Sequence, residues 1–137
     1  MSVEENKTIV RQAFAGLASG EFGKIRDVLA PEAVIHQCGF LHPLPVMELI
    51  ERGGAYSPIH DRAVHLDQLI GEGDLVALRW HTDGVHTDPD HSANEAVPVS
   101  FPSMTFVRLA DGKIAEIWNM RDADTIQSQL YQAQHAS

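Results

Sequence analysis

Cysteine is nearly absent from this 137-residue chain, because Cys38 is its only thiol. A single cysteine forms no internal disulfide and no cysteine-based zinc motif. Low cysteine use is typical of proteins in a reducing compartment, so we expect a cytoplasmic protein. We interpret Cys38 itself as a small apolar side chain.

Basic residues are also scarce. The chain has 10 lysines and arginines against 19 acidic residues, a formal net charge of -9 with histidine neutral. Nucleic acids and anionic membrane surfaces attract clusters of lysine and arginine, so we expect neither as a partner. No stretch approaches the roughly 20 apolar residues that span a bilayer. The first residues lack the basic segment and apolar run of a signal peptide, and we expect none.

The first part of the chain shows helical periodicity. Apolar residues recur at helical spacing over residues 4–18, and a second short helix is predicted over residues 22–29, stopped before Pro31. A short strand over residues 33–38 and a third helix over residues 46–55 follow. Because only a short break separates the helices predicted over residues 4–18 and 22–29, we expect these two helices to form a helical hairpin.

The second half of the chain alternates apolar and polar residues, which indicates consecutive strands joined by hairpins. Helices followed by such strands indicate the α+β class, with an antiparallel sheet in a single domain over residues 1–137. A curved sheet of this kind, covered by helices on one side, encloses an apolar cavity. The predicted strands cover residues 60–70, 75–83, 97–109 and 113–122, with a loop over 84–96 and a helix over 125–134.

The last predicted strand carries Trp118, Met120 and Asp122. Side chains in a strand alternate between two faces, so these three are expected to point the same way. We predict that they line an apolar pocket with one acid at its end. A carboxylate that loses hydration has a raised pKa and exchanges protons near neutral pH, which makes Asp122 the candidate catalytic acid and base. The alternative is that Asp122 caps the C-terminal helix.

His36 is the second catalytic candidate. It shares a strand face with Val34 and Cys38, and we expect it to point inward. There it would hydrogen-bond an enolate oxygen or orient Asp122. The alternative is a core histidine that is bonded to the backbone.

Large apolar side chains are candidates for substrate contacts. Aromatic and thioether walls suit flat ligands with fused rings, and the alternative for most of these residues is ordinary core packing. Arg79 belongs to the other face of its strand, where we expect it to pair across strands or at a subunit interface. The predicted substrate-binding side chains are Phe14, Tyr56, Trp80, Trp118 and Met120.

Residues 81–91 contain three histidines and three aspartates, which raises the question of a metal site. Their regular five-residue spacing between histidines is not a zinc pattern. Strand alternation also places His81 and His86 on opposite faces. We therefore predict a solvated loop and no metal.

Three motifs stand out beyond these patterns: Gly73-Asp74-Leu-Val-Ala-Leu-Arg79-Trp80, Gly84-Val-His86-Thr87, and Arg108-Leu-Ala-Asp-Gly-Lys-Ile-Ala-Glu-Ile-Trp118 with Asp122 beyond. In these motifs and in element order the chain resembles the SnoaL-like polyketide cyclases of the NTF2-like superfamily. The resemblance implies an NTF2-like α+β barrel, a cone-shaped curved antiparallel sheet wrapped around N-terminal helices. It also implies an intramolecular aldol closure without metal or cofactor, with Asp122 as general acid and base. His86 matches a histidine of the family and is expected to reach the pocket rim.

We therefore predict an enzyme without cofactors that cyclises or isomerises a hydrophobic, polyketide-like carbonyl compound. Because residues 84–96 depart from the family's pattern, the alternative is a protein that binds or senses a small ligand without catalysis. A purely structural oligomer, meeting through Arg79 and Arg108 on the sheet's outer face, is a third possibility. A homodimer or homotetramer is expected with any of the three, since a broad sheet face needs a cover.

Overall fold

The computed structural model describes residues 2–51, 59–86 and 96–135. Its helices are α1 (Val3–Ser19), α2 (Phe22–Arg26), α3 (Val46–Glu51) and α4 (Ala123–His135). Its strands are β1 (Leu29–Gln37), β2 (Leu44–Pro45), β3 (Ile59–Glu72), β4 (Leu75–His86), β5 (Val97–Ala110) and β6 (Lys113–Arg121). Within these ranges, no helix has both the length and the apolar content needed to cross a membrane.

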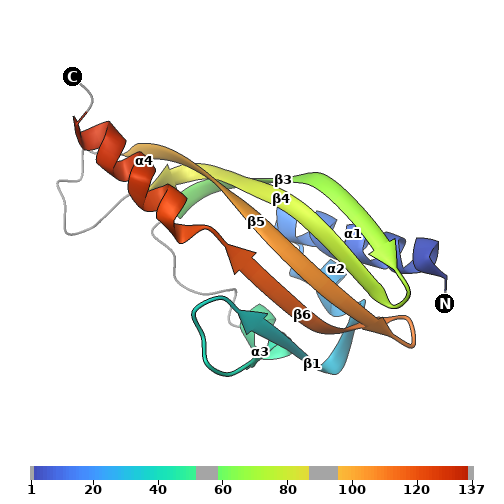
Figure 1. Cartoon of the computed structure of the whole chain (residues 1–137). Helices are drawn as coiled ribbons and strands as arrows, with labels where there is room; N and C mark the ends of the chain where they lie inside the picture. The colour runs from blue at the N-terminus through green and yellow to red at the C-terminus, as the bar shows by residue number, and fades with distance from the viewer. Residues whose placement is uncertain (1, 52–58, 87–95, 136–137) are drawn as a thin grey trace.

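The strands form a curved, unclosed sheet of six strands in the order β2-β1-β6-β5-β4-β3 (Figure 1). Neighbouring strands are antiparallel except β1 and β6, which run parallel. The α+β class and the four consecutive strands β3 to β6 are confirmed. The predicted curved antiparallel sheet is confirmed, and among the described strands β1 and β6 form the one parallel pair. Hairpin links force β3 to β6 to alternate in direction, but no hairpin joins β1 to β6.

Local sequence signals explain where several elements begin and end. The Ser2 side chain accepts a hydrogen bond from the Glu5 backbone and caps α1, and Gly20, with a φ of 75°, ends that helix. Asp111 and Gly112 both have positive φ angles, 52° and 76°. This is the backbone of a tight hairpin turn, as the Asp-Gly pair predicts.

Two predicted boundaries differ from the structure. The second helix ends at Arg26 instead of reaching Leu29. Strand β1 begins at Leu29 and runs through Pro31. The residue before a proline favours an extended backbone, so the chain changes from helix to strand before Pro31. The first three residues of the predicted 84–96 loop belong to β4, and most of the rest lies outside the described residues.

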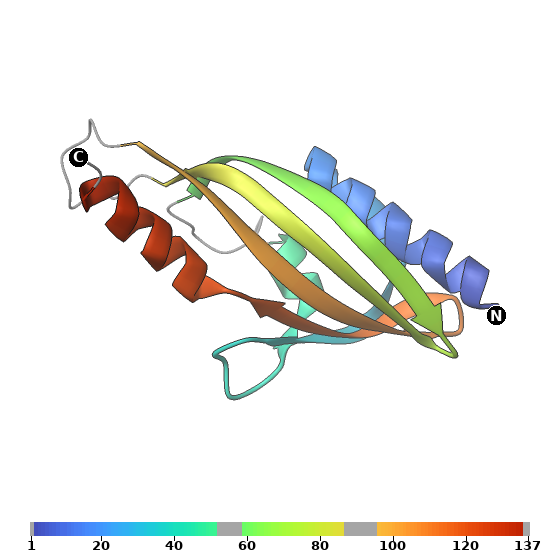
Figure 2. The ribbon, with the colours of Figure 1, turned by 45° about the horizontal axis from the view of Figure 1, so that its top comes forward.

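The two faces of the sheet are clearest along β5, where every second residue is buried. Val107 and Leu109 share a core cluster with Val10 of α1, and Val99 and Phe101 pack against α4. In Figure 2, α1 lies along β3 at one end of the sheet and α4 lies at the other end, where it packs on β5. All four of these β5 residues lie at alternate positions and therefore share one face of the strand. We call this the inner face and the opposite one the outer face.

Strand β6 carries a one-residue bulge at Ala115. Arg108 pairs with Glu116 and Leu109 with Ile114, so Ala115 has no partner on β5. One extra residue in a strand exchanges the two faces for every residue beyond it. Ile117, Asn119 and Arg121 therefore pair with the inner residues of β5, whereas Glu116, Trp118 and Met120 pair with its outer residues.

Candidate functional site

A chain of polar side chains crosses the inner face over four neighbouring strands. The Trp80 indole N–H donates to the Thr105 hydroxyl at 3.0 Å, and that hydroxyl donates to the Asn119 side-chain oxygen Oδ1 at 2.7 Å. The Asn119 side-chain amide then donates to the Gln37 side-chain oxygen Oε1 at 3.3 Å. We call Trp80, Thr105, Asn119 and Gln37 the inner polar chain. Polar groups on a core-facing surface carry hydrogen-bonding capacity that an apolar ligand's few polar atoms can use.

Apolar and polar neighbours flank the inner polar chain. The Phe14 ring of α1 meets the Trp80 ring edge to face, with centroids 5.6 Å apart and planes at 77°. The Ser103 hydroxyl is buried and has no hydrogen-bond partner among the described residues. Of the predicted substrate-binding residues, the structure therefore brings Phe14 and Trp80 together on the inner face.

Asp122 lies at the junction of β6 and α4, and its side chain is exposed. Its carboxylate accepts hydrogen bonds from the Thr125 backbone N–H at 3.1 Å and from the Thr125 hydroxyl. These bonds are those of a helix N-cap, because a carboxylate satisfies a free N–H in the first turn of α4. The prediction of a dry surrounding for Asp122 is therefore wrong. Its acid–base role stays a prediction.

His86 ends β4 on the inner face, since it pairs with Val97 of β5. His81 lies on the outer face, as the alternation predicted. The Asp122 backbone N–H is bonded to the Pro102 carbonyl, five residues along β5 from Val97. Five residues of strand span about 17 Å, so His86 and Asp122 are too far apart to exchange a proton directly.

Three predicted site residues lie on the outer face instead of the inner one. Trp118 pairs with Phe106, Met120 with Met104, and the Met120 side chain is 64% exposed. His36 pairs with Trp118 in the parallel register and stacks on its ring at 5.4 Å. The placement of Trp118, Met120 and His36 in an inner pocket is therefore wrong. The bulge at Ala115 is the physical reason, since uninterrupted alternation from buried Ile114 would have brought residues 116, 118 and 120 to the inner face.

His36 has a specific partner on the outer face. Its Nε2 lies 2.6 Å from a Glu116 carboxylate oxygen, and the Arg108 guanidinium donates to the other oxygen at 3.2 Å. The His36 hydrogen bond, with a smaller contribution from Arg108, lowers the pKa of the Glu116 carboxyl. His36 thus serves an ion-pair cluster across β1, β6 and β5.

This cluster predicts how stability changes with pH. A carboxyl whose pKa is lowered by folding stabilises the native state above its ordinary pKa of 4.5, and this contribution disappears as pH falls below the folded value. We expect Glu116→Gln to be less stable than the wild type at pH 6, and the gap between the two to be smaller at pH 3. Urea unfolding at both pH values measures the difference, and an equal gap at both would contradict the assignment.

Tyr56 lies outside the described residues. A hollow of about 430 Å³ lies at the end of the sheet opposite α4, between the start of α1 and two hairpin turns. Asn6, Asp74 and Asp111 are among its lining residues, and none of the predicted site residues is.

Sequence reasoning missed Thr105, Asn119 and Gln37. One signal for Thr105 is present, because Ser103 and Thr105 interrupt an otherwise apolar face that runs from Val99 to Leu109. No such signal marks Asn119, whose face is decided by the bulge at Ala115.

Comparison with known proteins places these features in a wider context. A family model described as SnoaL-like polyketide cyclase matches residues 7–130. None of the curated proteins matches the chain.

Several solved structures share its fold. A candidate polyketide cyclase from Acidithiobacillus ferrooxidans superposes with a TM-score of 0.78 at 20% identity, covering 97% of this chain and 99% of that one. IdmH, a candidate polyketide cyclase from Streptomyces antibioticus, superposes with a TM-score of 0.75 at 23% identity, covering 92% of this chain and 98% of that one. An LEH-like epoxide hydrolase from M. tuberculosis superposes with a TM-score of 0.72 at 15% identity, covering 98% of this chain and 95% of that one. Because these identities are low and the names differ in chemistry, the likeness shows the fold alone.

Proposed function

The chain belongs to the SnoaL-like polyketide cyclase family, and on this basis we propose that it is a cyclase or isomerase that needs no cofactor. Its substrate would be a hydrophobic carbonyl compound of the polyketide kind, bound at the inner face of the sheet. The inner polar chain, set beside Phe14 and Trp80, is the observation that carries this proposal.

The inner polar chain has hydrogen-bond donors to spare. A side-chain amide has two N–H groups, and Asn119 uses one of them on Gln37. The Gln37 amide and the buried Ser103 hydroxyl add further donors on the same face. Donors fixed in advance stabilise the negative charge that develops on a carbonyl oxygen when an enolate forms. This arrangement supports binding of a carbonyl oxygen near Asn119.

Asp122 is our proposed proton carrier. Asn119 and Asp122 are three residues apart along the chain, and β6 ends at Arg121, so a substrate held near Asn119 would have to extend about 10 Å, past the end of that strand, to meet the Asp122 carboxylate. Asp122 would take a proton from a carbon between two carbonyl groups. The enolate carbon would then bond to a second carbonyl carbon, and protonated Asp122 would return the proton to the alkoxide. An apolar substrate lying over the carboxylate would exclude water and increase its basicity.

The capping geometry of Asp122 favours a second candidate function. An exposed carboxylate that accepts two hydrogen bonds from Thr125 has a structural role without any chemistry. In that case the inner face would bind a small hydrophobic ligand and leave it unchanged. Both candidates need the same binding face, and they differ in what Asp122 does.

A second copy of the chain is the partner we propose for the outer face. Ile70, Met104, Phe106 and Met120 are 53–64% exposed and lie with Trp118 on the outer face of β3, β5 and β6, and we call these five residues the outer apolar patch. The same face carries Arg79 and Arg108 as well as Glu116. A twofold contact between two such faces covers apolar surface and brings opposite charges together. This supports a homodimer, or a homotetramer built from two of them.

The two tryptophans test where the ligand binds, because Trp80 lies on the inner face and Trp118 on the outer one. A panel of hydrophobic β-dicarbonyl compounds would be titrated while tryptophan fluorescence is recorded. We expect a binding compound to change the fluorescence of the wild type and of Trp118→Phe with the same affinity. Trp80→Phe should lose nearly all of the change. A response that depends on Trp118 instead would rule out the inner face as the binding site.

A further inference from the structure

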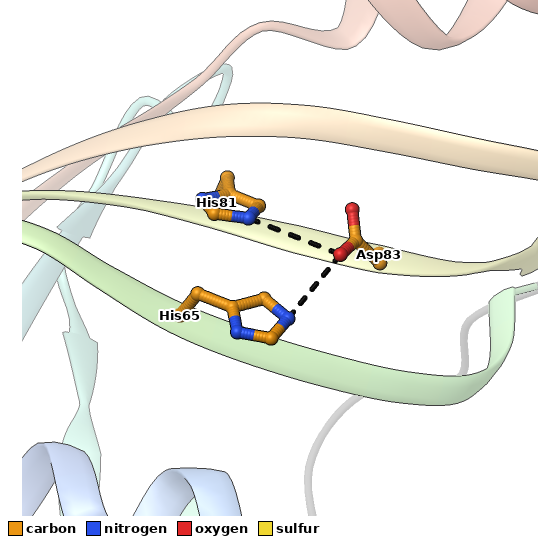
Figure 3. A group of neighbouring side chains, drawn as sticks. All are labelled: His65, His81 and Asp83. Atoms are coloured by element: carbon orange, nitrogen blue, oxygen red, sulfur yellow. Dashed lines mark ion pairs between the residues drawn. The ribbon is translucent and has the colours of Figure 1, made fainter.

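Two histidines and one aspartate converge on the outer face of β3 and β4 (Figure 3). One ligand atom from each of His65, His81 and Asp83 lies within 4.8 Å of the others. One Asp83 oxygen is 3.2 Å from His65 Nε2 and 3.8 Å from His81 Nε2. Two ligands of a tetrahedral zinc ion, each 2.0–2.1 Å from it, are about 3.3 Å apart. The two separations from the Asp83 oxygen are therefore close to those around a bound ion, and the two histidine nitrogens lie within 4.8 Å of each other.

The backbone holds these three residues together. His65 and His81 are direct partners in the antiparallel β3–β4 register, and Asp83 follows His81 by two residues on the same face. The two imidazole rings stack with centroids 4.6 Å apart and planes at 21°. About half of each of the His65 and Asp83 side chains is exposed. They can make the last small adjustment toward an ion without disturbing the core.

A fourth residue, Asp67, orients His81. Both Asp67 carboxylate oxygens lie near His81 Nδ1, at 2.8 and 2.9 Å. A carboxylate in this position holds the proton on Nδ1 and leaves the Nε2 lone pair free for a metal. Nε2 is the His81 atom that faces Asp83. This carboxylate–histidine pair is the usual support of a metal-binding histidine.

The local charge also favours a cation. Within the described part of the chain, no lysine or arginine pairs with Asp67 or Asp83. The Ser100 side chain also hydrogen-bonds the Asp83 carboxylate. The cluster therefore sets two carboxyl side chains beside two imidazoles, a donor set that suits a cation.

We propose that His65, His81 and Asp83 bind a divalent transition-metal ion, with Asp67 as the residue that positions His81. Two imidazoles and one carboxylate suit Zn²⁺, Ni²⁺, Cu²⁺ and Fe²⁺ better than Mg²⁺ or Ca²⁺, which prefer oxygen ligands. Three protein ligands leave a coordination position open to water. The proposal does not depend on the activity proposed for the inner face, because the cluster lies on the opposite face of β4.

Residues 81–91 alone do not contain this cluster, and from them no metal was predicted. His65 is 16 residues earlier in the chain, and the β3–β4 pairing brings it to His81. Asp67 reaches His81 because a register shift between Leu66 and Gln68 leaves it out of the regular pairing.

Calorimetric titration of the full chain with ZnCl₂ at pH 7.5, after treatment with a chelator, tests the proposal. We expect one ion per chain at this site. His65→Gln and His81→Gln should each weaken its binding at least tenfold, and Asp67→Asn should weaken it by about 10- to 100-fold. His42→Gln is the matched control, because His42 is exposed and far from the cluster in the β1–β2 turn, and it should bind like the wild type.

A second measurement identifies the ligands directly. The imidazole NMR signals of His65 and His81 should shift on addition of one equivalent of Zn²⁺, and those of His36 and His42 should not. Equal affinity in the wild type, His65→Gln and His81→Gln would overturn the proposal, because the ion would then lie elsewhere. The proposal would also be overturned if Asp67→Asn bound Zn²⁺ with unchanged affinity and the imidazole NMR signals of His65 and His81 did not shift. Circular dichroism of each variant separates loss of the site from loss of the fold.

Discussion

Asp122→Asn is expected to lower turnover by about 10²- to 10⁴-fold while leaving the stability of the fold almost unchanged. Asparagine cannot carry the proton that the proposed aldol chemistry moves. Its side-chain oxygen can still accept the hydrogen bond from the Thr125 backbone N–H, and asparagine and aspartate cap helices about equally well. Initial rates on a compound found by fluorescence titration measure the first effect, and urea unfolding measures the second.

Two further substitutions separate the chemical role of Asp122 from its capping role. Asp122→Ala removes both the acid and the cap, and should cost about 1 kcal/mol of stability in addition to the loss of turnover. Asp122→Ser removes the acid and keeps a good capping group, so it should fold like the wild type and be as inactive as Asp122→Asn. If Asp122→Asn keeps turnover within tenfold of the wild type, Asp122 is a cap and the acid–base proposal fails.

The same variants distinguish an enzyme from a binding protein. Ligand affinity should be similar in the wild type and in Asp122→Asn, because the donors assigned to ligand binding lie on β1, β5 and β6 before Asp122. An enzyme would lose turnover and keep affinity. A binding protein would show no turnover in either form, with the same affinity in both.

Much of the fold follows from local rules that a sequence displays. The capped helix α1 and the Asp111-Gly112 turn each depend on a few neighbouring residues, and both were predictable. The face assignments along β4 were predictable for the same reason. Its alternation runs without a break, and His81 and His86 lie on opposite faces as expected.

The candidate site was harder to predict because it depends on pairing between distant strands. A single unpaired residue, Ala115, exchanges the faces of β6 and moves Trp118 and Met120 away from the inner side. The parallel pairing of β1 with β6 then takes His36 to the same outer face. Neither event leaves a periodic signal, because a bulge has no fixed sequence and strand order is not local.

Phe106→Asp is expected to convert a dimer of this protein into a monomer. Phe106 lies within the outer apolar patch, and its side chain is 53% exposed in the single chain. If a second copy covers the patch, an aspartate there would be buried without a partner, which costs several kcal/mol and weakens association by more than about 100-fold. Sedimentation velocity over a range of concentrations measures the change. The inner face should remain folded, because Phe106 points away from it.

Leu41→Asp is the matched control for this test. Leu41 is 96% exposed, yet it lies in the turn between β1 and β2, outside the outer apolar patch. The same apolar-to-acidic change there should leave the dimer intact, so a general effect of added negative charge can be separated from loss of the interface. A wild type that remains monomeric at every concentration would contradict the dimer, and so would Phe106→Asp sedimenting as a dimer. Because Trp118 lies in the patch, its fluorescence should also change on dilution of the wild type and stay constant in Phe106→Asp.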